Sequence, residues 1–132
     1  MIVVDVNILA YLLIGGDRTQ VCREVFRKDP VWNAPYIWRS EFRNVLAKYI
    51  RHANMPLEGA KLRMKEATGL LGGREYFLPS GSILEIVNGQ PVSAYNAEYA
   101  FLASKLGTRL VTTDKPLLEM FPSIAIPPER FL

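Results

Sequence analysis

Short apolar runs alternate with longer amphipathic stretches along the whole chain. Residues 2–4 (Ile-Val-Val) form an uninterrupted β-branched run, which is typical of a strand covered on both faces of its sheet. Further short runs predict strands over residues 31–35, 75–79, 109–114 and 123–127. The amphipathic stretches predict helices over residues 7–14, 17–28, 37–52, 57–71, 82–87, 93–106 and 115–121.

Several of these helices carry start and stop signals. Asp17 and Ser93 are each placed to cap the start of a helix. Gly107 follows the helix over 93–106 and is expected to end it in the left-handed conformation. The long helix over 37–52 has one apolar stripe, which we expect to face the core: Trp38, Phe42, Val45, Leu46 and Tyr49.

The alternation of strands and helices predicts the fold class. Parallel strands need a crossover between them, and a helix usually supplies it. We therefore expect an α/β protein, a three-layer α/β/α sandwich around a central parallel sheet of four or five strands. The chain has 132 residues and no internal repeat, so residues 1–132 are expected to form a single domain.

Composition excludes some classes of protein and points weakly to a partner. No apolar run approaches the ~20 residues of a membrane span, and no basic-then-apolar leader opens the chain, so no membrane association is expected. The lone cysteine, Cys22, excludes an internal disulfide and fits a reducing, cytoplasmic setting. We expect Cys22 to be buried in the core. The formal net charge of +3 favours a polyanionic partner only slightly.

Two aspartates directly follow predicted strands. Asp5 ends the run over 2–4, and Asp114 ends the run over 109–114. If these strands are parallel neighbours, both carboxylates emerge at the edge where ligands bind in open α/β sheets. Glu41 lies at the margin of the long helix's apolar stripe, close to the core. Carboxylates held close together repel one another, and a hard divalent cation, Mg²⁺ or Mn²⁺, compensates that repulsion.

Each of these acids also has a purely structural interpretation. Asp5 and Asp114 precede helical stretches, where Asp is a favoured N-cap. Glu41 has Arg39 and Arg43 on the same helix, and either one offers an ion pair. The three acids taken together, in these topological positions, favour the metal site.

Four short motifs, in order, resemble those of PIN domains. They are VVDVN on the first strand, SEF in the long helix, SAYNAEYAFLASKLG, and RLVTTD on a late strand. The sequence is most similar to the VapC-like toxins of prokaryotic toxin–antitoxin pairs, and the resemblance covers essentially the whole chain. It implies a PIN-like fold and a metal-dependent endoribonuclease with Mg²⁺ or Mn²⁺ as cofactor. It also implies a homodimer and, often, a small antitoxin protein that blocks the site.

The resemblance implies roles for particular residues. The acidic metal ligands of the family are matched by Asp5, Glu41 and Asp114. Positions that usually support those ligands or the phosphate are matched by Asn7, Thr112 and Thr113. In the mechanism that such ions imply, one or two Mg²⁺ lower the pKa of a bound water and stabilise an in-line phosphoryl transition state.

One catalytic position departs from the family pattern. Members usually have Asp in the YDA motif, and this chain reads Tyr95-Asn96-Ala97. Asn96 retains a carbonyl oxygen but has lost the charge, so a second ion is expected to bind more weakly. Glu98 is not expected to replace it, because two residues along a helix turn the side chain by roughly 200°. Asn96 also has a structural interpretation, since it can support the helix start at Ser93.

Basic and aromatic residues near the acids are candidates for binding RNA. Arg39 and Arg43 flank Glu41 and are expected to reach the substrate. Trp32 and Trp38 offer rings for stacking on bases, although the place of Trp38 in the apolar stripe favours core packing or a dimer face.

Two other classes of protein compete with the nuclease. A catalytically weak or inactive PIN-fold module that binds RNA or protein would have the same fold without turnover, and Asn96 keeps this alternative open. A phosphoacceptor signalling domain would need paired acids after the first strand and an acceptor Asp after a central strand. This chain has one acid there and no Asp between Asp29 and Asp114, so that class is disfavoured.

Overall fold

A five-stranded, all-parallel sheet forms the centre of the molecule. The structure, a computed structural model, describes every residue from 1 to 132. The strands are β1 (Ile2–Val4), β2 (Trp32–Pro35), β3 (Glu75–Tyr76), β4 (Leu110–Val111) and β5 (Ala125–Ile126), in the order β3-β2-β1-β4-β5. The helices are α1 (Val6–Leu13), α2 (Thr19–Lys28), α3 (Trp38–His52), α4 (Leu57–Leu71), α5 (Ser80–Gly89), α6 (Ala94–Leu106), α7 (Lys115–Met120) and α8 (Pro128–Phe131).

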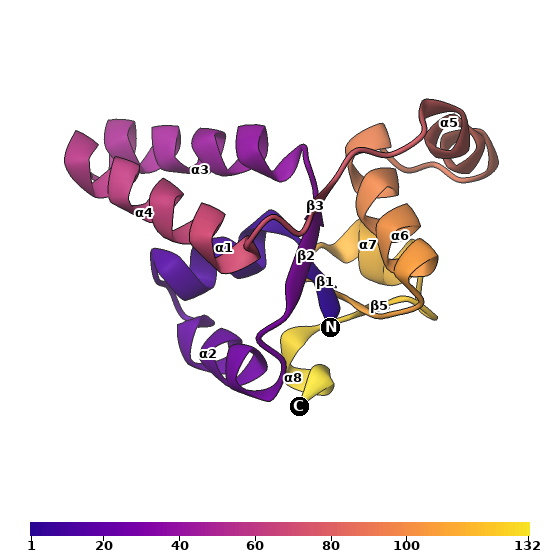
Figure 1. Cartoon of the computed structure of the whole chain (residues 1–132), viewed down its shortest axis with the longest axis horizontal. Coiled ribbons are helices and arrows are strands. Elements are labelled where there is room, and N and C mark those ends of the chain that lie inside the picture. The colour runs from indigo at the N-terminus through magenta and orange to yellow at the C-terminus, as the bar shows by residue number, and fades with distance from the viewer.

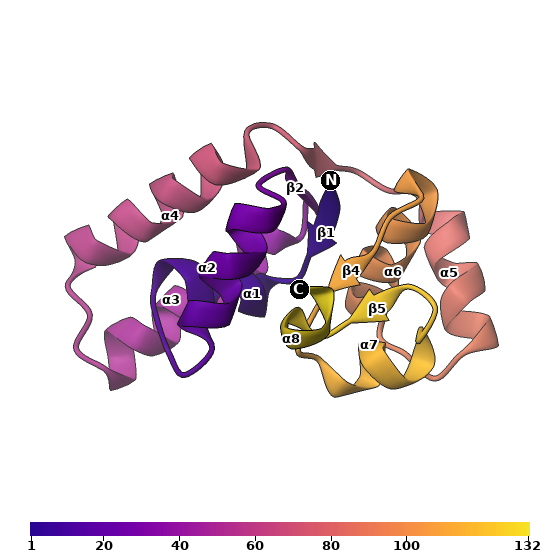
Figure 2. The same cartoon turned by 90° about the horizontal axis from the view of Figure 1, so that it is seen from below.

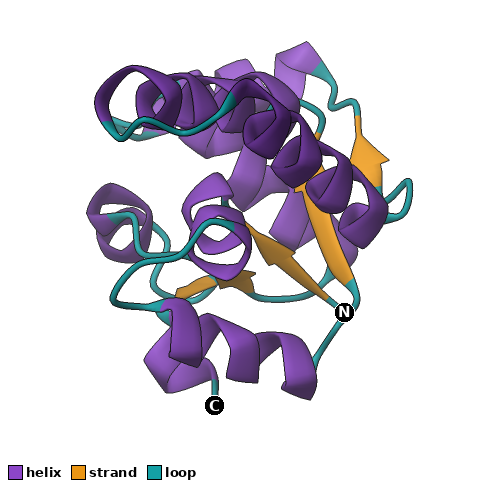
Figure 3. Cartoon of the chain, turned by 90° about the vertical axis from the view of Figure 1, so that its left-hand side faces the viewer, coloured by secondary structure: helices purple, strands orange, loops and turns teal.

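Helices cover both faces of this sheet, which confirms the predicted three-layer α/β/α architecture. Seen edge-on, the sheet separates α1 to α4 from α6 and α7, and α5 lies beyond α6 (Figure 1). The view from below shows the same division, with α8 returning towards α2 (Figure 2). Figure 3 shows the strands enclosed between helices from a third direction.

The alternation of side chains along β1 explains why there are two cores. Ile2 and Val4 point towards α1 to α4 and join one buried cluster, whereas Val3 points the other way and joins a second cluster with α6 and α7. All three side chains are buried, as the unbroken β-branched run predicted. The two clusters hold the helical layers against opposite faces of one strand.

The strand order places a crevice at the end of β1. β1 pairs with β2 on one side and with β4 on the other, with Val3 opposite both Asn33 and Leu110. The chain leaves β1 towards β2 and returns on the other side at β4, so the order reverses beside β1. In open α/β sheets, ligands bind outside the carboxyl ends of the strands at such a reversal. Asp5 directly follows β1, and Asp114 lies three residues after the end of β4.

One local prediction is wrong, and one short helix was not predicted. Asp17 does not cap α2: the helix begins after Arg18, and no side chain bonds its first amides. Thr19 instead ties the helix start to α1 by donating a hydrogen bond to the Tyr11 carbonyl at 2.8 Å. The short helix α8 was not expected, because the sequence near Pro127 and Pro128 resembled the end of a strand only.

Other expectations at helix ends and in the core are confirmed. Ser93 caps α6 by accepting a hydrogen bond from the Asn96 amide, and Gly107 ends the helix in the left-handed conformation with φ of 65°. Cys22 is fully buried, and burial raises the pKa of its thiol to about 11. The suggestion that Trp32 and Trp38 stack on bases is wrong, because both rings are fully buried; for Trp38 this is the core packing that the apolar stripe favoured. None of the helices has both the length and the apolar character needed to cross a lipid bilayer.

Candidate functional site

Asp5 is buried at the point where β1 becomes α1. Its Oδ1 caps the helix by accepting hydrogen bonds from the amides of Asn7 (3.0 Å) and Ile8 (3.2 Å). Its Oδ2 accepts a hydrogen bond from the Thr112 hydroxyl. The residue is 5% exposed, and burial raises its pKa to about 6, with a further contribution from the negative charge of Asp114. The N-cap interpretation is therefore correct. A helix cap alone, however, does not explain why a carboxylate with no basic side chain beside it is buried.

Asp114 lies beside Asp5 because Thr112 joins the two. The Thr112 hydroxyl donates to Asp5 and accepts a hydrogen bond from the Asp114 amide at 2.9 Å. Asp114 also caps α7, with Oδ1 accepting from the Leu117 amide at 2.9 Å and from the Asn96 side-chain amide at 3.3 Å. The ends of β1 and β4 and the start of α6 thus meet in one hydrogen-bonded network.

Glu41 approaches this network from α3. Its Oε1 accepts a hydrogen bond of 2.6 Å from the hydroxyl of Tyr99, a buried residue of α6. Burial raises the pKa of Glu41, and the negative charges of Glu98 and Asp114 raise it further. The pKa of Tyr99 is raised well above its ordinary value, mainly by burial, so its hydroxyl keeps the proton that it donates.

The carboxylates of this site have no basic partner. The six ion pairs of the chain all lie elsewhere and involve none of four acids: Asp5, Glu41, Glu98 and Asp114. Glu75 gives the contrast, since its hydrogen bond from Arg39 lowers its pKa. The negative charge of Asp114 raises the pKa values of Asp5 and Glu41, and that of Glu98 raises the pKa of Glu41. Even so, no three acidic, histidine or cysteine side chains are close enough to hold one ion. The site gathers negative charge without forming a closed set of ligands.

The donor set itself suits a hard divalent cation. Carboxylates and the Asn96 amide offer only oxygen as ligand atoms, the chemistry that Mg²⁺ and Mn²⁺ select. Each carboxylate oxygen has a second lone pair, so the caps and the Thr112 bond leave acceptor capacity free. A cation here would also stabilise the ionised forms of Asp5 and Glu41, whose pKa values are raised mainly by burial and further by neighbouring negative charge.

The other residues named from the sequence lie in different situations. Asn7 is exposed, and its amide contributes to the Asp5 cap, while Thr113 lies between Thr112 and Asp114. Arg39 is held away from Glu41 by a bidentate pair with Glu75, at 2.6 and 2.9 Å. Glu41 therefore forms no ion pair with either arginine of its own helix, so the purely structural interpretation of Glu41 is wrong.

Arg43 differs from Arg39 in having no acidic partner. It is exposed on α3, one turn beyond Arg39, and makes no ion pair or side-chain hydrogen bond. Of the two arginines expected to reach substrate, it is the one whose charge is free.

Two residues of the site were not anticipated from the sequence. Tyr99 orients Glu41, and its position on the inner face of α6, three residues after Asn96, was the available signal. Glu98 forms no hydrogen bond with Asn96 or Asp114, but it comes near enough to Glu41 to raise the pKa of that carboxyl. The site therefore has a fourth acid, which lies near Glu41.

The order of the strands, the flanking helices and the acidic carboxyl edge define a PIN-like α/β fold. Among solved structures, the fold is similar to that of PAE2754 from Pyrobaculum aerophilum, with a TM-score of 0.75 and 23% sequence identity. The match covers 98% of this chain and 92% of that one, so it extends over the entire architecture. No protein-family model and no curated protein matches the sequence. At this identity the similarity is one of fold.

Proposed function

We propose that this protein is a metal-dependent endoribonuclease of the PIN type, acting as the toxin of a toxin–antitoxin pair. The observation that carries the proposal is the gathering of unpaired carboxylates from β1, α3, α6 and the end of β4 at one edge of a PIN-like sheet. The fold and the ordered sequence motifs support it. A homodimer, a small antitoxin partner and a reducing, cytoplasmic setting belong to the same proposal.

In this proposal Asp5, Glu41 and Asp114 hold Mg²⁺ or Mn²⁺, and Asn96 contributes a carbonyl oxygen. The bound cation supplies an activated water and stabilises negative charge on the phosphate. The chain's own residues fix the ligands: Thr112 sets the spacing of the two aspartates, and Tyr99 orients Glu41. Such positioning residues typically affect metal affinity or activity by 10- to 100-fold.

Cleavage of single-stranded RNA tests the proposal. The purified protein should cut a labelled oligoribonucleotide in Mn²⁺ or Mg²⁺, and EDTA should abolish the cutting. Asp5→Asn preserves an N-cap but removes the charge, so the variant should lose activity while remaining folded. Equal cutting by wild type and Asp5→Asn would reveal a contaminating nuclease and contradict the proposal.

A binding module without turnover is the second candidate. Two observations favour it: Asn96 replaces an acid, and no three acids form a closed ligand set. Calorimetry with Mn²⁺ separates the candidates, because the nuclease requires binding that Asp5→Asn removes. Absence of metal binding, together with unchanged RNA affinity in Asp5→Asn, would establish the module.

A further inference from the structure

A pocket of about 590 Å³ opens beside the acidic site. It is lined by the start of α3, the end of β3 with the loop that follows, α5 and the start of α6. Glu98 lines this pocket and is also near enough to raise the pKa of Glu41, so the pocket and the acids adjoin. Its size lies within the range of pockets that hold small organic ligands, ~300–1,000 Å³.

A pair of aromatic rings forms part of the pocket wall. Tyr36 and Phe77 stack with their centroids 4.4 Å apart and their planes at 21°. Phe77 is 82% exposed, so its position comes from this stacking and not from burial in the core. The Arg39 guanidinium, fixed by Glu75, lies 5.2 Å from the centroid of Tyr36. Phe77 is therefore held with one ring face against Tyr36, and its other face is open to solvent.

The pocket also contains one cation whose charge is free. Arg39 lines the pocket, but Glu75 neutralises its charge. Arg43 lines it one helical turn further on, is exposed, and has no acidic partner. A flat aromatic surface beside an unpaired guanidinium combines the two features that bind single-stranded nucleic acid: stacking for a base and positive charge for a phosphate.

We infer that this pocket is a nucleobase subsite, in which one unpaired RNA base stacks on the open face of Phe77 while an adjacent phosphate binds Arg43. A base paired within a duplex cannot present its face in this way, so the subsite selects single-stranded RNA. The inference deepens the proposed nuclease function, since the pocket adjoins the acids through Glu98. A second copy of the chain is the competing occupant.

Binding in a background that does not cleave RNA tests this subsite apart from the chemistry. In Asp5→Asn protein, a fluorescent single-stranded oligoribonucleotide should bind 5- to 150-fold more weakly after Phe77→Ala, the range that ~1–3 kcal/mol per stacked base implies. Phe77→Trp should keep the affinity. Leu62→Ala is the matched control, because Leu62 is an exposed apolar residue of α4 outside the pocket. Since Phe77 is mostly exposed, its truncation should leave the fold intact.

Two further probes identify what is bound. Arg43→Gln should reduce the slope of log affinity against log salt by about 0.7, the loss of one phosphate contact on a single strand. An oligonucleotide with abasic residues should bind Phe77→Ala and Phe77 proteins equally.

Several results would overturn the subsite. The first is that the Asp5→Asn protein does not bind RNA, and the second is that Phe77→Ala still weakens binding to the abasic strand. The third is that Phe77→Ala leaves the affinity for RNA unchanged but lowers the oligomeric mass measured by sedimentation. The last result would assign the surface to a second copy of the chain. Loss of cutting in Asp5→Asn with normal cutting by Phe77→Ala would reject the subsite and leave the nuclease standing. If RNA binding depends on Phe77 but the wild-type protein never cuts RNA, the subsite stands and the nuclease proposal is rejected.

Discussion

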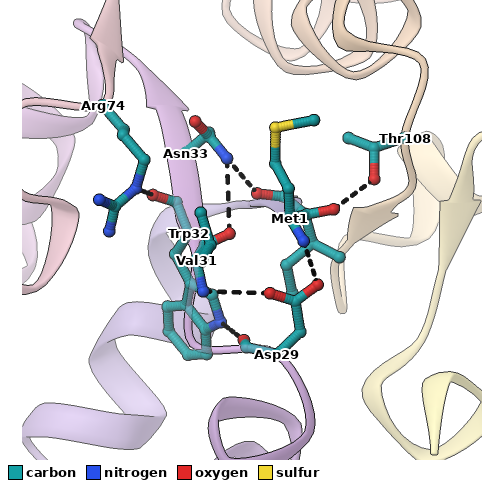
Figure 4. Close-up of polar contacts among 8 residues, drawn as sticks. Met1, Asp29, Val31, Trp32, Asn33, Arg74 and Thr108 are labelled. Carbon is teal, nitrogen blue, oxygen red and sulfur yellow. Dashed lines mark hydrogen bonds and ion pairs between the residues drawn. The ribbon is translucent and has the colours of Figure 1, made fainter.

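At the edge of the sheet where β1 begins, Asp29 accepts hydrogen bonds from the Val31 amide and the Met1 amino group (Figure 4). At the edge where β1 ends, Asp5 accepts hydrogen bonds from two amides and a hydroxyl, and no cation pairs with it. Both carboxylates are hydrogen-bonded next to the same strand. They differ in that only the first has a compensating positive charge.

Other polar side chains at the amino edge also have hydrogen-bond partners. Asn33 donates to the Ile2 carbonyl at 3.0 Å, and the Arg74 guanidinium donates to the Trp32 carbonyl at 2.9 Å (Figure 4). The Asn33 side chain also accepts a hydrogen bond of 3.0 Å from the Tyr76 hydroxyl. At the carboxyl edge, every buried polar side-chain atom also has a hydrogen-bond partner. The neutral groups are thus satisfied at both edges, and of the two edges only the carboxyl edge gathers uncompensated negative charge, where we propose that a cation binds. Such a concentration of charge costs stability and is typical of functional sites.

The largest expected difference in RNA cleavage is between matched Asp→Asn substitutions at the two edges. Asp114→Asn keeps a cap for α7 but removes a proposed ligand charge, so RNA cleavage in Mn²⁺ should fall more than about 100-fold. Asp29→Asn removes a paired charge from the other edge and should leave specific activity unchanged. Cleavage of one labelled strand by both purified variants checks this, and an equal loss in the two would mean that the edges do not differ in function.

The stability of the metal-free protein should depend on pH through Asp5. The pKa of Asp5 is about 6 in the folded chain against an ordinary 3.8, so the folded state binds the proton more tightly. Its contribution to the free energy of unfolding is therefore complete below about pH 4 and is lost as the pH rises through about 6. Asp5→Asn should remove this dependence and stabilise the protein at pH 7 by up to about 3 kcal/mol.

Urea unfolding in EDTA at a series of pH values measures that difference. Asp29→Asn serves as the control and should keep the dependence on pH. Addition of Mg²⁺ should reduce the wild-type loss at pH 7, because a cation stabilises the ionised form. An Asp5→Asn variant with the same pH profile as wild type would show that Asp5 is not the group responsible.

The opposite edge should respond to the loss of a neutral group. Asn33→Ala leaves the Ile2 carbonyl and the Tyr76 hydroxyl without their buried partner, which should cost about 2 kcal/mol of unfolding free energy. The specific activity of the folded protein should not change, since the Asn33 side chain bonds Ile2, Val31 and Tyr76 and none of the proposed metal ligands. Denaturation at 25 °C with parallel RNA assays tests this. A variant of normal stability and reduced activity would place Asn33 within the functional site.

The smallest expected effect concerns the departure from the family pattern. Asn96→Asp restores a carboxylate beside Asp114, so Mn²⁺ affinity should rise by roughly tenfold and cleavage should rise with it. In EDTA the same variant should be less stable at pH 7, because it adds like charge to the site. Calorimetric titration with Mn²⁺ gives the affinity, and an unchanged value would exclude position 96 from the ligands.

The parts of the structure that sequence could predict are those that local rules determine. The β-branched run over 2–4 indicated a strand buried on both faces, and the acid after it indicated the edge where function lies. Parallel pairing then placed Asp5 and Asp114 together without any knowledge of their side-chain contacts. Likewise, Ser93 and Gly107 defined the limits of α6 through backbone requirements that a few neighbouring residues decide.

The parts that could not be predicted depend on residues distant in the chain. Glu75 captures Arg39 from a position 36 residues away, because β3 lies beside β2 and the start of α3. Tyr99 reaches Glu41 across 58 residues, where α6 and α3 meet above the sheet edge. Sequence spacing along one helix suggests only local pairs, so the wrong partner was considered for Glu41 and the free arginine was not distinguished from the bound one.

One hydroxyl group sets the separation of two carboxylates. Thr112 lies 107 residues from Asp5 in the chain, yet it donates to that side chain and receives the amide of Asp114. Valine has nearly the same outline as threonine but can do neither. The separation of the two aspartates thus depends on the orientation of a single short side chain. Replacing Thr112 by valine would leave the surrounding packing in place but release both aspartates from their common hydrogen-bond partner.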